Sequence, residues 1–139
     1  MRYAIRDTPS AIGHRLLVLV GPTAVGKSAM AIELAERLGG EIISADSRYL
    51  YRGMDIGTAK PSPADRTRAP HHLIDVTDPD RPWSLAQYQQ AAARLIGEIN
   101  DRGRLPLLVG GTGQYVRAVL EGWTIPKREP DPAVRSELE

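Results

Sequence analysis

The sequence predicts an α/β fold in which a mostly parallel sheet lies between layers of helices. Short apolar runs stand at residues 16–20, 41–45 and 105–111, and stretches with helical periodicity separate them. A glycine loop connects the first run directly to a helical stretch. Because a strand, a helix and a strand in this order form a right-handed crossover, the neighbouring strands should be parallel.

Periodicity, turn residues and helix caps place the elements along the chain. The first helix carries Met30, Leu34 and Leu38 four residues apart on one face. Ser84 is the predicted N-cap of a long amphipathic helix that Gly103 ends. In chain order we predict a strand at 16–20, a helix at 27–38, a strand at 41–45, a long loop at 52–72, a short strand at 73–76, a helix at 85–102, a strand at 105–111 and a helix at 113–122.

Composition limits the fold and the class of partner. The 139 residues suffice for one core, and 42% hydrophobic with 25% charged residues is typical of a globular protein. A formal net charge of +1 gives no general attraction to nucleic acid or to a membrane surface. The absence of cysteine excludes disulfides, thiolate metal sites and a cysteine nucleophile. Without a bilayer-spanning run or a signal-peptide pattern, we expect a cytoplasmic protein with no membrane partner.

The motif GPTAVGKS matches the pattern G-x-x-x-x-G-K-[ST] in full. It follows a predicted strand and opens a predicted helix, as a phosphate-binding loop requires. We therefore predict a P-loop NTPase-like fold in which backbone N–H groups and the Lys27 ammonium hold a diphosphate or nucleotide, and the Ser28 hydroxyl binds Mg²⁺. The predicted binding residues are Gly21, Pro22, Thr23, Ala24, Val25, Gly26, Lys27 and Ser28.

Two aspartates that follow predicted strands are candidates for chemistry. ATP-hydrolysing proteins usually place a metal-binding carboxylate after a neighbouring apolar strand, but the run at 105–109 ends in Gly-Gly-Thr. Asp75 is the alternative, either as a metal carboxylate or as a turn residue. Asp46 follows the second strand, at the sheet edge where open α/β folds bind ligands. Asp46 is either a general base facing the glycine loop or the N-cap of the next turn.

Four segments resemble, in order and spacing, the tRNA dimethylallyltransferases, also called tRNA isopentenyltransferases: GPTAVGKS, ISADSRYLYRGMDIGTAKP, HHLIDV and LPLLVGGTGQYVRAVLEG. The resemblance covers residues 16–123, and GMDIGTAKP is its most specific motif. It implies that the loop binds the diphosphate of dimethylallyl diphosphate. It also implies transfer of the dimethylallyl group to N6 of the adenosine beside the anticodon, with release of diphosphate. The implied partners are dimethylallyl diphosphate and the tRNA anticodon arm.

The resemblance assigns roles to individual residues. Asp46 matches the family's motif aspartate, which would accept a proton from the N6 amine as the new bond forms. Thr23 would contact the diphosphate near the leaving oxygen, so Asp46 and Thr23 are the predicted catalytic residues. Access to N6 inside an anticodon loop requires displacement of the base into a pocket. The predicted tRNA-binding residues are Asp46, Ser47, Arg48, Tyr49 and Thr112.

The resemblance also predicts how the chain is organised. Members of the family are longer, so we expect residues 1–123 to form the P-loop catalytic core and residues 124–139 to begin a helical tRNA-binding insertion. The fold would then be incomplete at its C-terminus, and the chain an N-terminal fragment of a protein that is monomeric at full length. Two other functions stay open: a P-loop small-molecule kinase, and a module that binds diphosphate or nucleotide without turnover.

Overall fold

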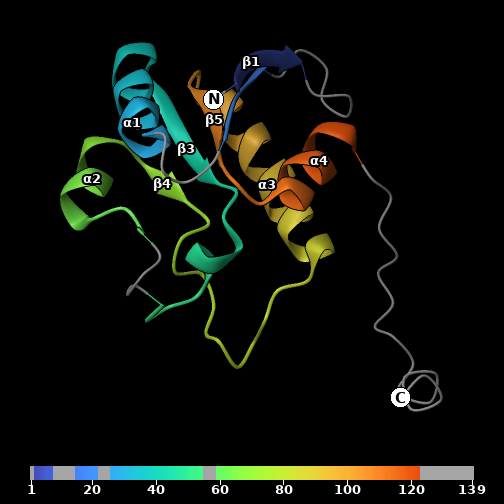
Figure 1. Ribbon diagram of the computed structural model, residues 1–139. Coiled ribbons are helices and arrows are strands. Elements are labelled where there is room, and N and C mark those ends of the chain that lie inside the picture. The colour runs from blue at the N-terminus through green and yellow to red at the C-terminus, as the bar shows by residue number, and fades with distance from the viewer. Residues whose placement is uncertain (1, 8–14, 22–25, 55–58, 123–139) are drawn as a thin grey trace.

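A five-stranded sheet, in the order β1-β2-β5-β3-β4, separates two groups of helices (Figure 1). The computed structural model describes residues 2–7, 15–21, 26–54 and 59–122. The strands are β1 (Arg2–Asp7), β2 (Arg15–Val20), β3 (Gly40–Ser44), β4 (His71–His72) and β5 (Leu105–Gly110). The helices are α1 (Lys27–Leu38), the short 3₁₀ helix η2 (Ser47–Leu50), α2 (Pro63–Arg68), α3 (Leu85–Asp101) and α4 (Gly113–Glu121).

The predicted parallel sheet is confirmed for β2, β5, β3 and β4, and β1 adds an antiparallel strand at the edge. Strand β5 lies between β2 and β3, although it follows both in the chain. Leu107 of β5 is in register with Leu17 on one side and with Ile42 on the other. Because these strands are parallel, the residues that follow β2, β5 and β3 meet at one edge of the sheet.

Alternating side chains of the central strands form two cores. Leu17 and Leu19 of β2 pack toward α1, while Leu16 and Val18 pack toward α3 and α4. Figure 1 shows the same division, with α1 and α2 on one side of the sheet and α3 and α4 on the other. The predicted apolar face of α3 is confirmed, since its buried residues are Tyr88, Ala92, Leu95, Ile96 and Ile99. No helix among the described residues is both long enough and apolar enough to cross a membrane.

Helix α1 turns a different face to the sheet than its leucine and methionine spacing suggests. Its buried apolar residues are Ala31, Ile32 and Ala35, whereas Met30 and Leu38 are exposed. Small alanine side chains let a helix approach the sheet closely, and the larger residues then lie on its flank. Ser84 is the N-cap of α3, as predicted, because its hydroxyl accepts a hydrogen bond from the Gln87 N–H at 3.1 Å.

The region predicted as a long loop and a short strand differs from that prediction. Residues 63–68 form α2, which begins with a capping box at Ser62. The predicted strand at 73–76 is wrong, because Leu73 and Asp75 have φ angles of 63° and 55°. An extended strand cannot contain left-handed residues, so pairing with β3 is confined to His71 and His72.

Candidate active site at the carboxyl edge of the sheet

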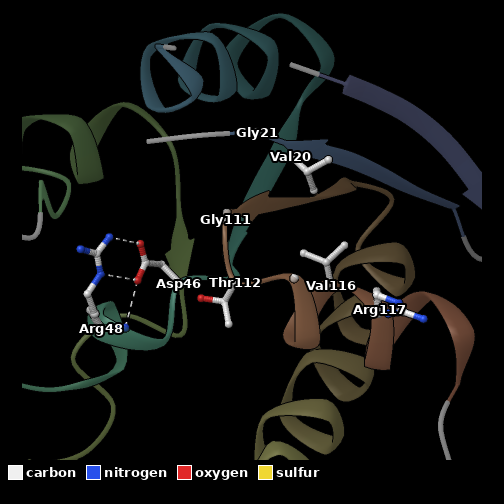
Figure 2. Close-up of a pocket in the computed structure, with 10 residues that line it drawn as sticks. Val20, Gly21, Asp46, Arg48, Gly111, Thr112, Val116 and Arg117 are labelled. Atoms are coloured by element: carbon white, nitrogen blue, oxygen red, sulfur yellow. Dashed lines mark hydrogen bonds and ion pairs between the residues drawn. The ribbon is translucent and has the colours of Figure 1, made fainter. Parts of the chain in front are cut away.

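A cavity of about 470 Å³ opens where the carboxyl ends of β2, β3 and β5 meet (Figure 2). Gly21 lines it after β2, Asp46 and Arg48 after β3, and Gly111 and Thr112 after β5. The first turns of α4 add further lining through Val116 and Arg117, two residues that the sequence prediction missed. Their only sequence signal is a helix that begins directly after a Gly-Gly-Thr turn at the binding edge.

The glycine loop brings a buried cation to this edge. The Lys27 side chain is buried, and its Nζ donates a hydrogen bond to the Gly21 carbonyl. A Cβ on Gly111 would lie 3.8 Å from Lys27 Nζ, so the ammonium lies beside the β5 turn as well. Burial lowers the pKa of Lys27, and the negative charge of Asp46 opposes this shift. The predicted loop residues 22–25, Thr23 among them, lie outside the described residues.

Asp46 is buried, and its carboxylate accepts hydrogen bonds from two groups of one residue, Arg48. Its Oδ1 accepts from the Arg48 backbone N–H at 3.0 Å, which makes Asp46 the N-cap of η2. The Arg48 guanidinium also binds both carboxylate oxygens, through Nε at 3.2 Å and Nη2 at 3.0 Å. The pKa of Arg48 is raised by these hydrogen bonds and by the negative charge of Asp46. Figure 2 shows the two side chains facing each other at the cavity wall.

Thr112 connects the β5 turn to η2. Its backbone N–H donates to the Ala45 carbonyl at 3.1 Å, and its Oγ1 accepts from the Ser47 N–H at 3.1 Å. Asp46 stands between these two contacts in the chain. Thr112 therefore fixes the backbone on both sides of the carboxylate and also lines the cavity.

The remaining predicted residues lie at a second, smaller cavity or contact other segments. Ser28 is exposed on the first turn of α1 and lines a cavity of about 30 Å³ with Ser44 and Tyr49. The Tyr49 hydroxyl donates to the Ala59 carbonyl at 2.9 Å, and burial raises the Tyr49 pKa. The structure thus brings Asp46, Arg48 and Thr112 to the larger cavity, whereas Ser28 and Tyr49 line the smaller one.

Asp75 is engaged by cations of the chain itself. Lys60 Nζ is 2.6 Å from its Oδ1, and Arg66 Nη1 is 3.1 Å from its Oδ2. Burial alone would raise the Asp75 pKa, but the hydrogen bonds and charges of Lys60 and Arg66 lower it below its ordinary value. Of the two alternatives for Asp75, the structure favours the turn residue.

Comparison with known proteins assigns the chain to a family. A family model described as IPP transferase matches residues 49–139, and one described as Isopentenyl transferase matches residues 14–78. The chain belongs to the IPP transferase family. Its α/β core is therefore P-loop-like, as predicted from the glycine loop.

Curated relatives and solved structures agree with this family. The chain is 60% identical over 126 residues to the tRNA dimethylallyltransferase of Chloroflexus aurantiacus, covering 91% of this chain and 43% of that protein. For the Roseiflexus castenholzii relative of the same name, identity is 61% over 124 residues, covering 89% of this chain and 40% of that protein. The chain thus spans about two fifths of the length of the curated relatives it matches.

Two solved structures have the same architecture. The full-length tRNA isopentenylpyrophosphate transferase from Bacillus halodurans is 51% identical with a TM-score of 0.77, covering 88% of this chain and 40% of that one. A eukaryotic dimethylallyltransferase whose structures are described as acting on tRNA is 30% identical, also with a TM-score of 0.77. That match covers 89% of this chain and 31% of the eukaryotic one.

Proposed function

We propose that the protein containing this chain transfers a dimethylallyl group from dimethylallyl diphosphate to N6 of the adenosine beside the anticodon in tRNA. One observation carries the proposal: Asp46 and Gly21, at the start of the glycine loop, line the same cavity, in a family whose curated relatives are named tRNA dimethylallyltransferase. Dimethylallyl transfer needs a group that holds the leaving diphosphate and a base that accepts the N6 proton, and a single cavity can hold both close to the reacting atoms.

The loop supports the departure of diphosphate. The carbon–oxygen bond of the donor breaks, and its electrons leave with the diphosphate. Lys27 is buried beside Gly21 and Gly111, so water screens its charge less than it would on the surface. A fixed positive charge near the leaving oxygens stabilises the negative charge that develops there.

Asp46 accepts the proton that N6 loses as the new carbon–nitrogen bond forms. Both of its oxygens bind Arg48 in this structure, so the N6 amine must displace or share one of these hydrogen bonds. The Asp46 side chain is 8% exposed and the Arg48 side chain 46% exposed. The guanidinium can therefore turn toward a tRNA phosphate while the carboxylate stays fixed by the η2 cap.

The described residues fit Mg²⁺ only as a partner of the diphosphate. No group of three or more His, Asp or Glu among them could hold a metal ion. Mg²⁺ commonly keeps several waters and binds one or two protein groups together with substrate phosphates. The exposed Ser28 hydroxyl is such a group. When bound, the ion would neutralise charge on the leaving diphosphate.

The remaining parts of the proposal concern tRNA and the state of the protein. Thr112 would lie against the displaced adenosine because it lines the cavity beside Asp46. Ser47, Arg48 and Tyr49 would contact the surrounding anticodon arm. We further propose that the complete protein is a cytoplasmic monomer.

Replacing Asp46 by alanine in the complete protein encoded by the gene tests the assignment of the base. We expect donor binding to be nearly retained and dimethylallyl transfer to tRNA to fall about 10²- to 10⁴-fold. Mass spectrometry of tRNA digests measures the transfer, and calorimetry measures donor binding. Undiminished transfer would leave Asp46 as a cap only. ATP-dependent phosphorylation of a small molecule, with no mass gain on tRNA, would replace the proposal by the kinase alternative.

A further inference from the structure

An ion pair between a buried lysine side chain and a partly exposed aspartate lies outside the cavity and is not used by the proposed chemistry. The Lys60 side chain is 6% exposed, and its Nζ lies 2.6 Å from Asp75 Oδ1. The same ammonium donates to the Tyr51 carbonyl at 3.0 Å. A lysine so buried cannot present its charge to solvent or to an RNA phosphate, so its partners within the protein define its role.

The Lys60–Asp75 pair joins the segments that support η2. The Asp75 N–H donates to the Tyr49 carbonyl and the Val76 N–H to the Leu50 carbonyl, each at 2.9 Å. These bonds attach residues 75–76 directly to the 3₁₀ helix whose N-cap is Asp46. On the other side, the Tyr49 hydroxyl donates to the Ala59 carbonyl, next to Lys60. The pair therefore closes a loop of contacts around the helix that carries Asp46.

The backbone at both ends of the pair is strained. Ala59, which precedes Lys60, has φ 54°, and Asp75 itself has φ 55°. Non-glycine residues adopt this left-handed conformation uncommonly, and alanine less readily than aspartate, so Ala59 in particular depends on contacts that hold it. Lys60 and Asp75 supply such contacts across 15 residues of chain.

We propose that Lys60 and Asp75 are positioning residues: by holding η2, they set the orientation of the Asp46 carboxylate at the cavity. This inference rests on the proposed function. Neither residue lines the cavity, so the pair acts through η2 and not by touching substrate. A displacement of about 1 Å at a reacting group can lower a rate about 100-fold, so loss of the pair should affect turnover.

The test compares Lys60→Met with Arg68→Met in the complete protein. Arg68 forms an equally short ion pair, Nε to Glu36 Oε1 at 2.6 Å, but its side chain is 51% exposed and its partner lies on α1. The two variants lose the same charge, and only Lys60→Met removes contacts to Asp75 and to Tyr51, the C-cap residue of η2. We expect kcat for tRNA to fall about 10- to 100-fold in Lys60→Met. KM for dimethylallyl diphosphate should change less than about twofold, and Arg68→Met should resemble wild type, since its pair is exposed.

Further variants separate positioning from a general loss of structure. Lys60→Arg retains the positive charge, so its kcat should be close to that of wild type and well above that of Lys60→Met. Asp75→Asn combined with Lys60→Met should lower kcat no further than the more damaging single change, because both remove the same contact. Melting temperatures show whether each variant is folded at the assay temperature.

The outcomes distinguish this inference from the proposed function. Equal kcat values for Lys60→Met and Arg68→Met would overturn the positioning role, as would a higher KM for tRNA with unchanged kcat. If wild type does not modify tRNA, the proposed function fails, and hydrogen exchange alone decides the inference. Peptides covering residues 73–78 should then exchange faster in Lys60→Met than in Arg68→Met, and equal exchange would overturn it.

Discussion

Replacing Gly110 by alanine should push apart the ends of β3 and β5 at the cavity. A Cβ at this position would lie 2.5 Å from the Ala45 carbonyl carbon and 2.9 Å from the Ala45 Cα, and closer still to the carbonyl oxygen. Real Cβ atoms essentially never come within 3.0 Å of such neighbours. All three contacted atoms belong to the backbone, so no side-chain rotation can relieve the clash. The strand ends must move instead.

The structure gives the size of the effect. Moving Ala45 away weakens two hydrogen bonds: Ala45 N–H to the Val109 carbonyl at 2.8 Å, and Thr112 N–H to the Ala45 carbonyl at 3.1 Å. Each is worth about 1 kcal/mol, and overpacking costs about 1–3 kcal/mol. The free energy of unfolding should therefore fall by about 3–5 kcal/mol, which lowers Tm by roughly 10–20 °C for a domain of this size.

Gly113→Ala is the matched control, because a Cβ there meets nothing within 4 Å. It should leave stability unchanged or raise it by up to about 1 kcal/mol, since alanine favours the helix that begins at this residue. Urea unfolding followed by circular dichroism measures both variants, and calorimetry measures donor binding. Gly110→Ala within about 0.5 kcal/mol of wild type would refute the argument from close approach.

Two further predictions concern the core and the opposite edge of the sheet. Tyr88→Phe removes a buried hydroxyl that donates to the Ser44 carbonyl at 2.7 Å and should lower the free energy of unfolding by about 1–2 kcal/mol in urea melts. Burial would raise the Glu41 pKa, but the hydrogen bonds and charges of Arg102 and His72 outweigh the effect of burial. The Glu41 pKa is therefore lower than its ordinary value of 4.5. Stability from Glu41 is therefore complete above about pH 4.5 and lost as the pH falls through the lowered value. Glu41→Gln should be about 1–3 kcal/mol less stable than wild type at neutral pH. If wild type and Glu41→Gln still differ in stability well below the lowered Glu41 pKa, the linkage argument is contradicted.

Much of the architecture could be predicted because local patterns determined it. Strand β2, helix α3 with its Ser84 cap, and strand β5 each have a clear apolar run or period between turn residues. The orientation of α1 could not be predicted in the same way. Spacing shows which residues share a face, but whether that face packs on the sheet depends on how closely the helix approaches it. Here Ala31 and Ala35 decide that approach.

Contacts between distant segments explain the other differences. Leu73 is left-handed because its surroundings hold it, and no local propensity of leucine predicts that conformation. The pairing of Lys60 with Asp75 spans a part of the chain that contains α2 and β4. Site residues that follow predicted strands, such as Asp46, could be located from the sequence. Residues that support them through other segments could not.

The two sequence interpretations of Asp46, a helix cap and a catalytic base, are compatible in one geometry. As a cap, Oδ1 accepts the Arg48 N–H, which fixes the carboxylate plane relative to η2. A carboxylate oxygen has more than one lone pair, so a cap does not exhaust its capacity to accept hydrogen bonds. The competing group is the Arg48 side chain, which is far more exposed than Asp46. A base with a fixed backbone contact and an exchangeable side-chain partner can keep its orientation while it exchanges the guanidinium for an amine. The cap would thus provide the preorganisation that the proposed proton transfer requires.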